Sequence, residues 1–173
     1  MFSDWGLSWG GWMDNRRGEW WLLAQLLLIA AHLLPPTPAP ATWGLEIWPR
    51  PLFLLGAVLL ITGLALAGLA FKSLGSSLSP LPTPKPGNQL ILNGPYQRCR
   101  HPMYQAVLTS SLGMAVAFGS LLHLLLLLGL ILVLGGKARL EEQALLQLHR
   151  NYALYQRHTP AIVANVPWLD WRS

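Results

Sequence analysis

A long uncharged stretch sets the strongest limit on how this chain can fold. Residues 102–136 contain no Lys, Arg, Asp or Glu, and a single α-helix of that length would measure about 52 Å. The hydrocarbon layer of a bilayer is only about 30 Å thick, so the stretch must fold back on itself. Glycine weakens a helix, and we place the turn at Gly119. The sequence therefore predicts two antiparallel membrane spans, at 102–118 and 120–136.

Two apolar segments precede this predicted hairpin. Residues 51–71 carry no charge and would form a helix of about 31 Å, long enough to cross a membrane. Residues 20–34 form a shorter segment that contains Gln25 and His32, and we expect it to span the membrane as well. A signal peptide is the alternative for this first segment, because two arginines precede it and residues 39–41 resemble a small-residue cleavage site.

The composition also indicates a membrane protein. Apolar residues make up 53% of the chain and charged residues only 11%, whereas soluble domains carry about 25% charged residues. The single cysteine, Cys99, excludes an internal disulfide and a cysteine-built zinc site, and we treat it as structural. We expect an all-α polytopic membrane protein with about four transmembrane helices, a hairpin of the last two and a cytoplasmic C-terminal helix, forming a single membrane domain over 1–173.

The basic residues fall almost entirely on one side of these four spans. Arg50 alone lies on the other side, and the turn near Gly119 has no basic residue. Because basic residues concentrate in cytoplasmic segments, we expect both termini and the segments 72–101 and 137–173 in the cytoplasm. The Trp-rich residues 1–19 are expected at the same membrane interface. Eleven basic residues share the cytoplasmic side: Arg16, Arg17, Lys72, Lys85, Arg98, Arg100, Lys137, Arg139, Arg150, Arg157 and Arg172.

Polar side chains gather at both ends of the predicted hairpin. Arg100, His101 and Tyr104 stand before it, and Glu141 and Glu142 follow it. Since the two spans are antiparallel neighbours, these groups must meet at the membrane surface. A solvated ring of charges is the alternative to a binding site there. A carboxylate that points toward the bundle needs a partner or a ligand; we assign that position to Glu141 and expect Glu142 to be solvated.

Other residues in the predicted spans concern helix packing. Gly56, Gly63 and Ala67 share one helical face, so a neighbouring helix can approach closely there. His32 and His123 lie within predicted spans, where an imidazole usually makes a hydrogen bond between helices. These five residues are interpreted as structural.

The order and spacing of the motifs around the hairpin resemble a known family. Over roughly 72–160 the chain is similar to the isoprenylcysteine carboxyl methyltransferase and phospholipid methyltransferase superfamily of integral membrane enzymes. The resemblance lies in the whole set of motifs and in the hairpin between them. The motifs are Gly94-Pro95-Tyr96, Arg100-His101-Pro102-x-Tyr104, Lys137-x-Arg139-x-Glu141-Glu142, Tyr152-x-x-Tyr155 and Thr159-Pro160.

This resemblance implies methyl transfer from S-adenosylmethionine to a lipophilic or membrane-partitioning acceptor. It implies a cofactor site at the cytoplasmic end of the hairpin, no metal ligands, and Lys137 and Arg139 as catalytic residues on the substrate side. A departing thioether needs no proton, so positioning can supply most of the acceleration. The cofactor-binding residues implied by position are Asn88, Gln89, Leu90, Ile91, Tyr96, Arg100, His101, Pro102, Met103, Tyr104, Glu141, Tyr152 and Tyr155.

Other functions stay open at this point. One is a phospholipid amine methyltransferase, and another is a noncatalytic membrane scaffold or subunit that binds a partner through its Trp-rich N-terminus. Tyr152 and Tyr155 could close over the cofactor or pack against the membrane interface. The basic residues form no stripe of the kind that binds nucleic acid. We expect the partners to be the bilayer and a lipophilic methyl acceptor, and the location to be a bacterial inner membrane.

Overall fold

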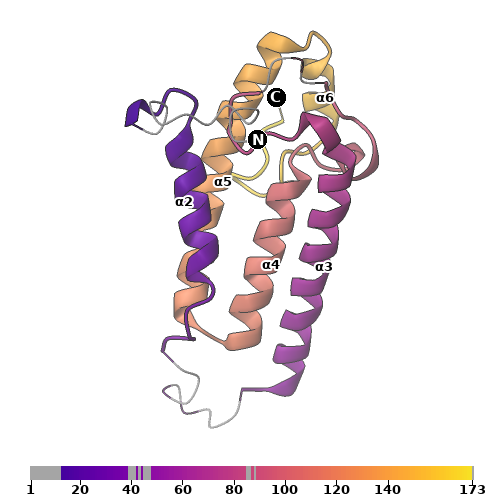
Figure 1. The fold of residues 1–173 in the computed structure, drawn as a ribbon. Coiled ribbons are helices and arrows are strands. Elements are labelled where there is room, and N and C mark those ends of the chain that lie inside the picture. The colour runs from indigo at the N-terminus through magenta and orange to yellow at the C-terminus, as the bar shows by residue number, and fades with distance from the viewer. Residues whose placement is uncertain are drawn as a thin grey trace.

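The computed structural model describes most of the chain, and its regular elements are helices (Figure 1). The described residues are 13–38, 42, 44, 48–84, 87 and 89–172. The α-helices are α2 (Glu19–Ala31), α3 (Arg50–Leu74), α4 (Pro102–Phe118), α5 (Leu121–Leu148) and α6 (Tyr152–His158), and the 3-10 helices are η3 (Gly75–Ser77) and η4 (Gly94–Gln97). No strand occurs among the described residues, so the all-α prediction is confirmed for them.

Two of the four predicted spans have the length and composition to cross a membrane. Helices α3 and α5 hold 25 and 28 residues, and among the described helices these two are long and apolar enough. Helix α2 has 13 residues and α4 has 17, which correspond to about 20 and 26 Å. The prediction of about four spanning helices is therefore confirmed only in part.

Proline and glycine set the ends of the two shorter helices. Helix α2 stops at Ala31, three residues before the end of the predicted span, because Pro35 and Pro36 follow and the chain turns ahead of them. Helix α4 begins at Pro102, whose missing N–H costs nothing in the first turn. It ends at Gly119, which adopts the left-handed conformation with φ 56°. The predicted turn at Gly119 is confirmed.

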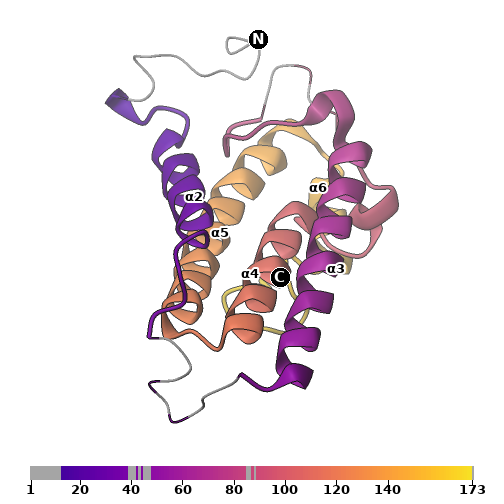
Figure 2. The same cartoon turned by 60° about the horizontal axis from the view of Figure 1, so that its bottom comes forward.

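The four largest helices lie across the bundle in the order α2, α5, α4, α3 (Figures 1 and 2). Glycines bring α3 and α4 together. A Cβ atom at Gly56 would lie 2.4 Å from the backbone nitrogen of Ala117, and one at Gly63 would lie 2.2 Å from Ser110 Oγ. The close approach predicted for this face of α3 is thus confirmed at Gly56 and Gly63.

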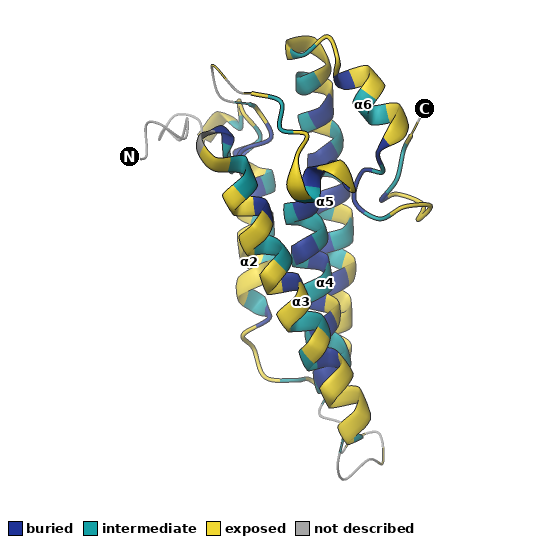
Figure 3. Ribbon diagram, turned by 90° about the vertical axis from the view of Figure 1, so that its right-hand side faces the viewer, coloured by how far each residue is buried: buried dark blue, intermediate teal, exposed yellow. Residues whose placement is uncertain are grey.

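The outer face of α3 carries large apolar side chains that are exposed. Much of this helix is therefore drawn in the colour of exposed residues in Figure 3. Leu54, Ile61 and Leu64 are each at least 60% exposed. An apolar surface of this extent marks contact with a membrane or a partner. Together with two helices that can cross a bilayer, it points to a membrane protein.

Buried polar side chains tie α2 to α4 and α5. His32 Nε2 lies 2.6 Å from Ser111 Oγ, and His32 Nδ1 lies 2.7 Å from the carbonyl oxygen of Leu28. His123 Nε2 lies 3.2 Å from the carbonyl oxygen of His32. The predicted hydrogen bonds between helices are confirmed, and they hold the C-terminal end of α2 in place.

After α6 the chain returns across the start of α4, and we call residues 159–172 the return segment. The backbone N–H groups of Arg100 and His101 each donate to a carbonyl of this segment at 2.9 Å. Ile162 is fully buried in the core together with leucines of α5. The return segment therefore fixes the start of α4 relative to the second half of α5.

Candidate functional site

A cavity of about 320 Å³ lies where the start of α4, the second half of α5 and α6 come together. This volume falls at the lower end of the range for small-molecule sites, about 300–1,000 Å³. Its wall also includes residues of α2, α3, η4 and the segment between α3 and η4. The residues from α2 and α3 are mostly apolar, whereas α4, α5 and α6 supply charged groups and tyrosines.

Most of the predicted site residues line this cavity, although they lie far apart in the sequence. Pro102 and Arg139 do not line it, and Asn88 lies outside the described residues. The antiparallel hairpin brings the two groups of motifs together as expected. The predicted residues in the cavity wall are Gln89, Leu90, Ile91, Tyr96, Arg100, His101, Met103, Tyr104, Lys137, Glu141, Tyr152 and Tyr155.

Glu141 presents a carboxylate to the cavity. The hydroxyl of Tyr104 donates to its Oε2 at 2.9 Å, and His101 Nδ1 lies 3.7 Å from the same oxygen. The Glu141 side chain keeps 27% of its surface exposed, so it remains accessible from the cavity. This carboxylate can accept hydrogen bonds from a ligand.

Lys137 holds a fixed ammonium in the cavity wall one helical turn before Glu141. Its Nζ donates to Gln25 Oε1 at 2.7 Å and to the carbonyl oxygen of Pro80 at 2.8 Å. The same nitrogen lies 5.4 Å from the ring centroid of Tyr104. Lys137 therefore links α5 to α2 and to the segment after η3. Gln25 was not predicted as a site residue, although a polar side chain within an apolar segment is a signal that could have identified it.

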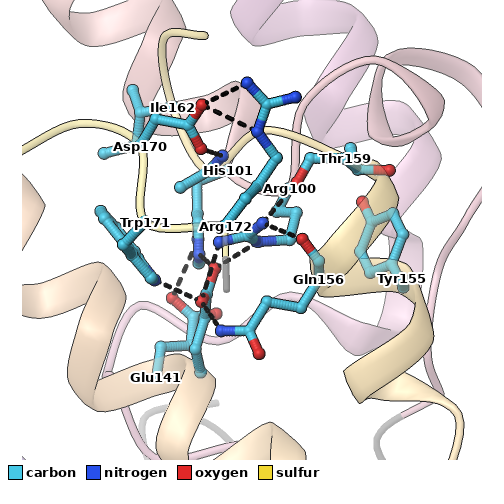
Figure 4. A network of polar contacts seen from close by, with 12 residues as sticks. Arg100, His101, Glu141, Tyr155, Gln156, Thr159, Ile162, Asp170, Trp171 and Arg172 are labelled. Carbon is cyan, nitrogen blue, oxygen red and sulfur yellow. Dashed lines mark hydrogen bonds and ion pairs between the residues drawn. The ribbon is translucent and has the colours of Figure 1, made fainter. Parts of the chain in front are cut away.

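Glu142 is buried, so the expectation that it is solvated is wrong. Only 2% of the residue is exposed. Four side chains donate to it: Arg100 Nε at 2.6 Å, His101 Nε2 at 2.9 Å, Gln156 Nε2 at 3.0 Å and Trp171 Nε1 at 2.6 Å. Figure 4 shows these four side chains converging from the segment before α4, from α6 and from the return segment. The physical reason is that α6 and the return segment cover this face of α5 and exclude water from it.

Arg100 belongs to the same buried cluster. Its guanidinium has no exposed surface; it donates through Nε and Nη2 to Glu142, and through Nη1 to the carbonyl oxygens of Gln156 and Thr159. These contacts within the protein occupy the guanidinium, so it serves as part of the cavity wall. Arg100 therefore lies next to the cavity, as predicted, but its charge is balanced within the protein.

Arg139 points away from the cavity, which corrects its prediction as the alternative substrate-side group to Lys137. Its guanidinium carbon lies 3.9 Å from the ring centroid of Trp168 and 4.5 Å from that of Trp171. Successive helical residues are rotated by about 100°, so a residue two positions after Lys137 faces nearly the opposite side of α5. Lys137 is the basic residue of this pair that lines the cavity.

Tyrosines form the wall beside Glu141. The hydroxyl of Tyr155 donates to the carbonyl oxygen of Tyr96 at 2.5 Å, and the rings of Tyr152 and Tyr155 meet edge to face at 5.8 Å. Burial, reinforced by the negative charge of Glu141, raises the pKa of Tyr96, and burial also raises the pKa of Tyr155. These phenols are therefore neutral at physiological pH.

Cys99 lies behind this wall and not in it. The thiol is buried and donates weakly toward the carbonyl oxygens of Ala161 and Ile162, with Sγ at 3.1 and 3.3 Å. Burial raises its pKa to about 12. A thiolate nucleophile is therefore not available here, in agreement with the structural role predicted for Cys99.

A family model matches the part of the chain that builds most of the cavity. The model described as phospholipid methyltransferase matches residues 52–152, more than half of the chain. The cobalt-zinc-cadmium resistance protein CzcN of Cupriavidus metallidurans is 36% identical over 75 residues, which cover 43% of this chain. The matched part is 35% of that relative, so the chain spans about a third of its length. No solved structure matches.

Proposed function

Because the chain belongs to the phospholipid methyltransferase family, we propose that it transfers a methyl group from S-adenosylmethionine to a lipophilic acceptor in this cavity. The observation that carries the proposal is the position of Glu141, whose carboxylate shares the cavity wall with four tyrosines. Carboxylates and aromatic faces are the groups that hold an organic cation. The tyrosines are Tyr96, Tyr104, Tyr152 and Tyr155.

The residues around Glu141 fit this cofactor. When bound, S-adenosylmethionine supplies a methyl group on a positively charged sulfur. The Glu141 carboxylate can accept hydrogen bonds from hydroxyl or ammonium groups, and neutral phenols add no competing charge. His101, Met103 and the segment 89–91 complete this side of the wall. We assign the cofactor to this end of the cavity.

Lys137 is proposed to orient the acceptor. Its ammonium has three donors, and Gln25 and Pro80 take two of them. The apolar residues from α2 and α3, among them Leu26 and Phe71, offer a surface for a hydrocarbon chain. The acceptor would then keep its apolar part against α2 and α3 and bring its polar end to Lys137. In this role the protein acts by positioning two reactants.

The methyl acceptor has a second candidate, a phospholipid amine, because the matching family model is described as phospholipid methyltransferase. We also propose that the cavity faces the cytoplasm from a bacterial inner membrane. The support for this orientation is the placement of eleven of the twelve basic residues on the cavity side of the predicted spans.

Titration calorimetry with S-adenosylhomocysteine on detergent-solubilised protein tests the proposal. We expect saturable binding at micromolar concentrations. Glu141→Gln should weaken binding, whereas the matched control Asp14→Asn should not, since Asp14 pairs with Arg16 at the exposed start of the described chain. The absence of binding to folded wild-type protein would overturn the proposal and favour a noncatalytic subunit. Incubation of labelled cofactor with phosphatidylethanolamine or with a lipophilic carboxylate then separates the acceptors.

A further inference from the structure

Residues beyond the family match complete the wall behind the cavity. The match ends at residue 152, yet Gln156 and Trp171 both donate to the buried carboxylate of Glu142. Trp171 belongs to the return segment, which follows α6 and crosses the start of α4. Residues after 152 therefore belong to the same buried cluster around Glu142 as Arg100 and His101, which lie within the family match.

The two oxygens of Glu142 share Arg100 as a donor and otherwise have different partners. Oε2 accepts from Trp171 Nε1 at 2.6 Å, from Gln156 Nε2 at 3.0 Å and from Arg100 Nη2 at 3.1 Å. Oε1 accepts from Arg100 Nε at 2.6 Å and from His101 Nε2 at 2.9 Å. The short bond from Trp171 thus holds Oε2, whereas His101 donates to Oε1. The rings of Trp171 and His101 are also neighbours, with centroids 6.4 Å apart.

His101 connects this carboxylate to the cavity. Its ring stacks on Tyr104 with centroids 5.3 Å apart and an interplanar angle of 2°. The Tyr104 hydroxyl in turn donates to Glu141, the carboxylate proposed to contact the cofactor. A shift of the Glu142 carboxylate would therefore move His101 and, through the stacked rings, the donor to Glu141.

We propose that Trp171 is a positioning residue of the cofactor site. Its indole N–H fixes the Glu142 carboxylate, and Glu142 fixes the orientation of the His101 ring. The stacked Tyr104 then presents its hydroxyl to Glu141. The identity of the bound cofactor rests on the proposed function above, whereas the chain of contacts is independent of it.

Trp168 provides a matched control within the return segment. Its Nε1 donates to the carbonyl oxygen of Ile131 at 3.2 Å, and its ring packs on Arg139, as the ring of Trp171 does. Trp168 is 44% exposed and does not line the cavity. Each of the variants Trp168→Phe and Trp171→Phe removes one indole donor and keeps an aromatic ring. They differ in the acceptor that loses its donor, which is the Ile131 carbonyl oxygen for Trp168 and the Glu142 carboxylate for Trp171.

The experiment measures two properties of both variants. Calorimetry with S-adenosylhomocysteine should show about tenfold weaker binding for Trp171→Phe, and less than a twofold change for Trp168→Phe. The loss lies at the low end of the roughly one to two decades of a direct hydrogen bond from ligand to carboxylate, because Trp171 acts on the ligand only through the wall. In the absence of ligand, the ¹⁵N chemical shifts of the His101 ring should change in Trp171→Phe and stay constant in Trp168→Phe. Gln156→Met removes another donor to the same oxygen and should change both properties in the same direction.

The outcomes separate this inference from the proposed function. Equal losses of affinity in the two tryptophan variants, or unchanged His101 shifts in Trp171→Phe, would overturn the positioning role. If wild-type protein does not bind S-adenosylhomocysteine but the His101 shifts respond to Trp171→Phe, the proposed function fails and the positioning of the wall stands. If Trp171→Phe does not fold, the response of the His101 shifts to Gln156→Met decides.

Discussion

Replacing Glu142 by glutamine should destabilise the protein much more than the same change at the neighbouring Glu141. Glu142 is 2% exposed and accepts hydrogen bonds from four side chains. Glu141 keeps 27% of its side chain exposed and accepts one bond from Tyr104. The two substitutions are chemically identical and adjacent in sequence, so they isolate the effect of burial.

The magnitude follows from the partner that is left behind. Arg100 has no exposed side-chain surface, and without the Glu142 charge its guanidinium stays buried without a counter-ion. Breaking a buried ion pair in this way costs about 3–5 kcal/mol of unfolding free energy. For a domain of this size, 1 kcal/mol corresponds to about 2–4 °C. We therefore expect Glu142→Gln to lower the melting temperature by roughly 6–20 °C.

Thermal unfolding in detergent, followed by tryptophan fluorescence, measures this difference. Glu141→Gln should melt within a few degrees of wild type, because a partly exposed carboxylate with one hydrogen bond contributes little to stability. It should instead weaken S-adenosylhomocysteine binding by about one to two decades, corresponding to roughly 1.5–3 kcal/mol for hydrogen bonds to a charged group.

The reasoning would be refuted by a Glu142→Gln protein that melts with the wild type. It would also be refuted if Glu141→Gln lowered the melting temperature as much as Glu142→Gln does. Either result would mean that the burial of Glu142 and its ion pair with Arg100 do not set the difference in stability between the two positions.

Four further predictions concern packing, thiol reactivity, topology and the acceptor. Gly63→Leu should separate α3 from α4 and lower the melting temperature, because even a Cβ atom there would lie 2.2 Å from a serine oxygen. Cys99, with its pKa raised to about 12, should resist alkylation at pH 8 until the protein unfolds. In intact cells, an impermeant thiol reagent should therefore label Leu121→Cys and not Lys72→Cys, an exposed position on the predicted cytoplasmic side. Lys137→Gln should reduce methyl transfer while retaining S-adenosylhomocysteine binding, and the exposed control Lys72→Gln should change neither.

The hairpin could be predicted from the sequence because local properties determine it. An uncharged stretch too long for one helix must turn, and Gly119, at the midpoint of the stretch, can adopt the left-handed backbone that the turn requires. Antiparallel packing of the two arms then brings the motifs before α4 next to those of α5. The end of α2 could also have been predicted from the sequence, because Pro35 and Pro36 follow it closely and disfavour a longer helix.

The role of each charged residue on α5 required the tertiary structure. Glu141 and Glu142 are one residue apart, or about 100° around the helix, and nothing local states which of the two faces the cavity. The position of the return segment decides this, because Trp171 and the backbone around it cover the face that carries Glu142. The same covering turns Arg139 toward Trp168 and away from the cavity. Side-chain environments along a continuous helix depend on which distant segments pack against it, and the sequence pattern of the helix does not contain that information.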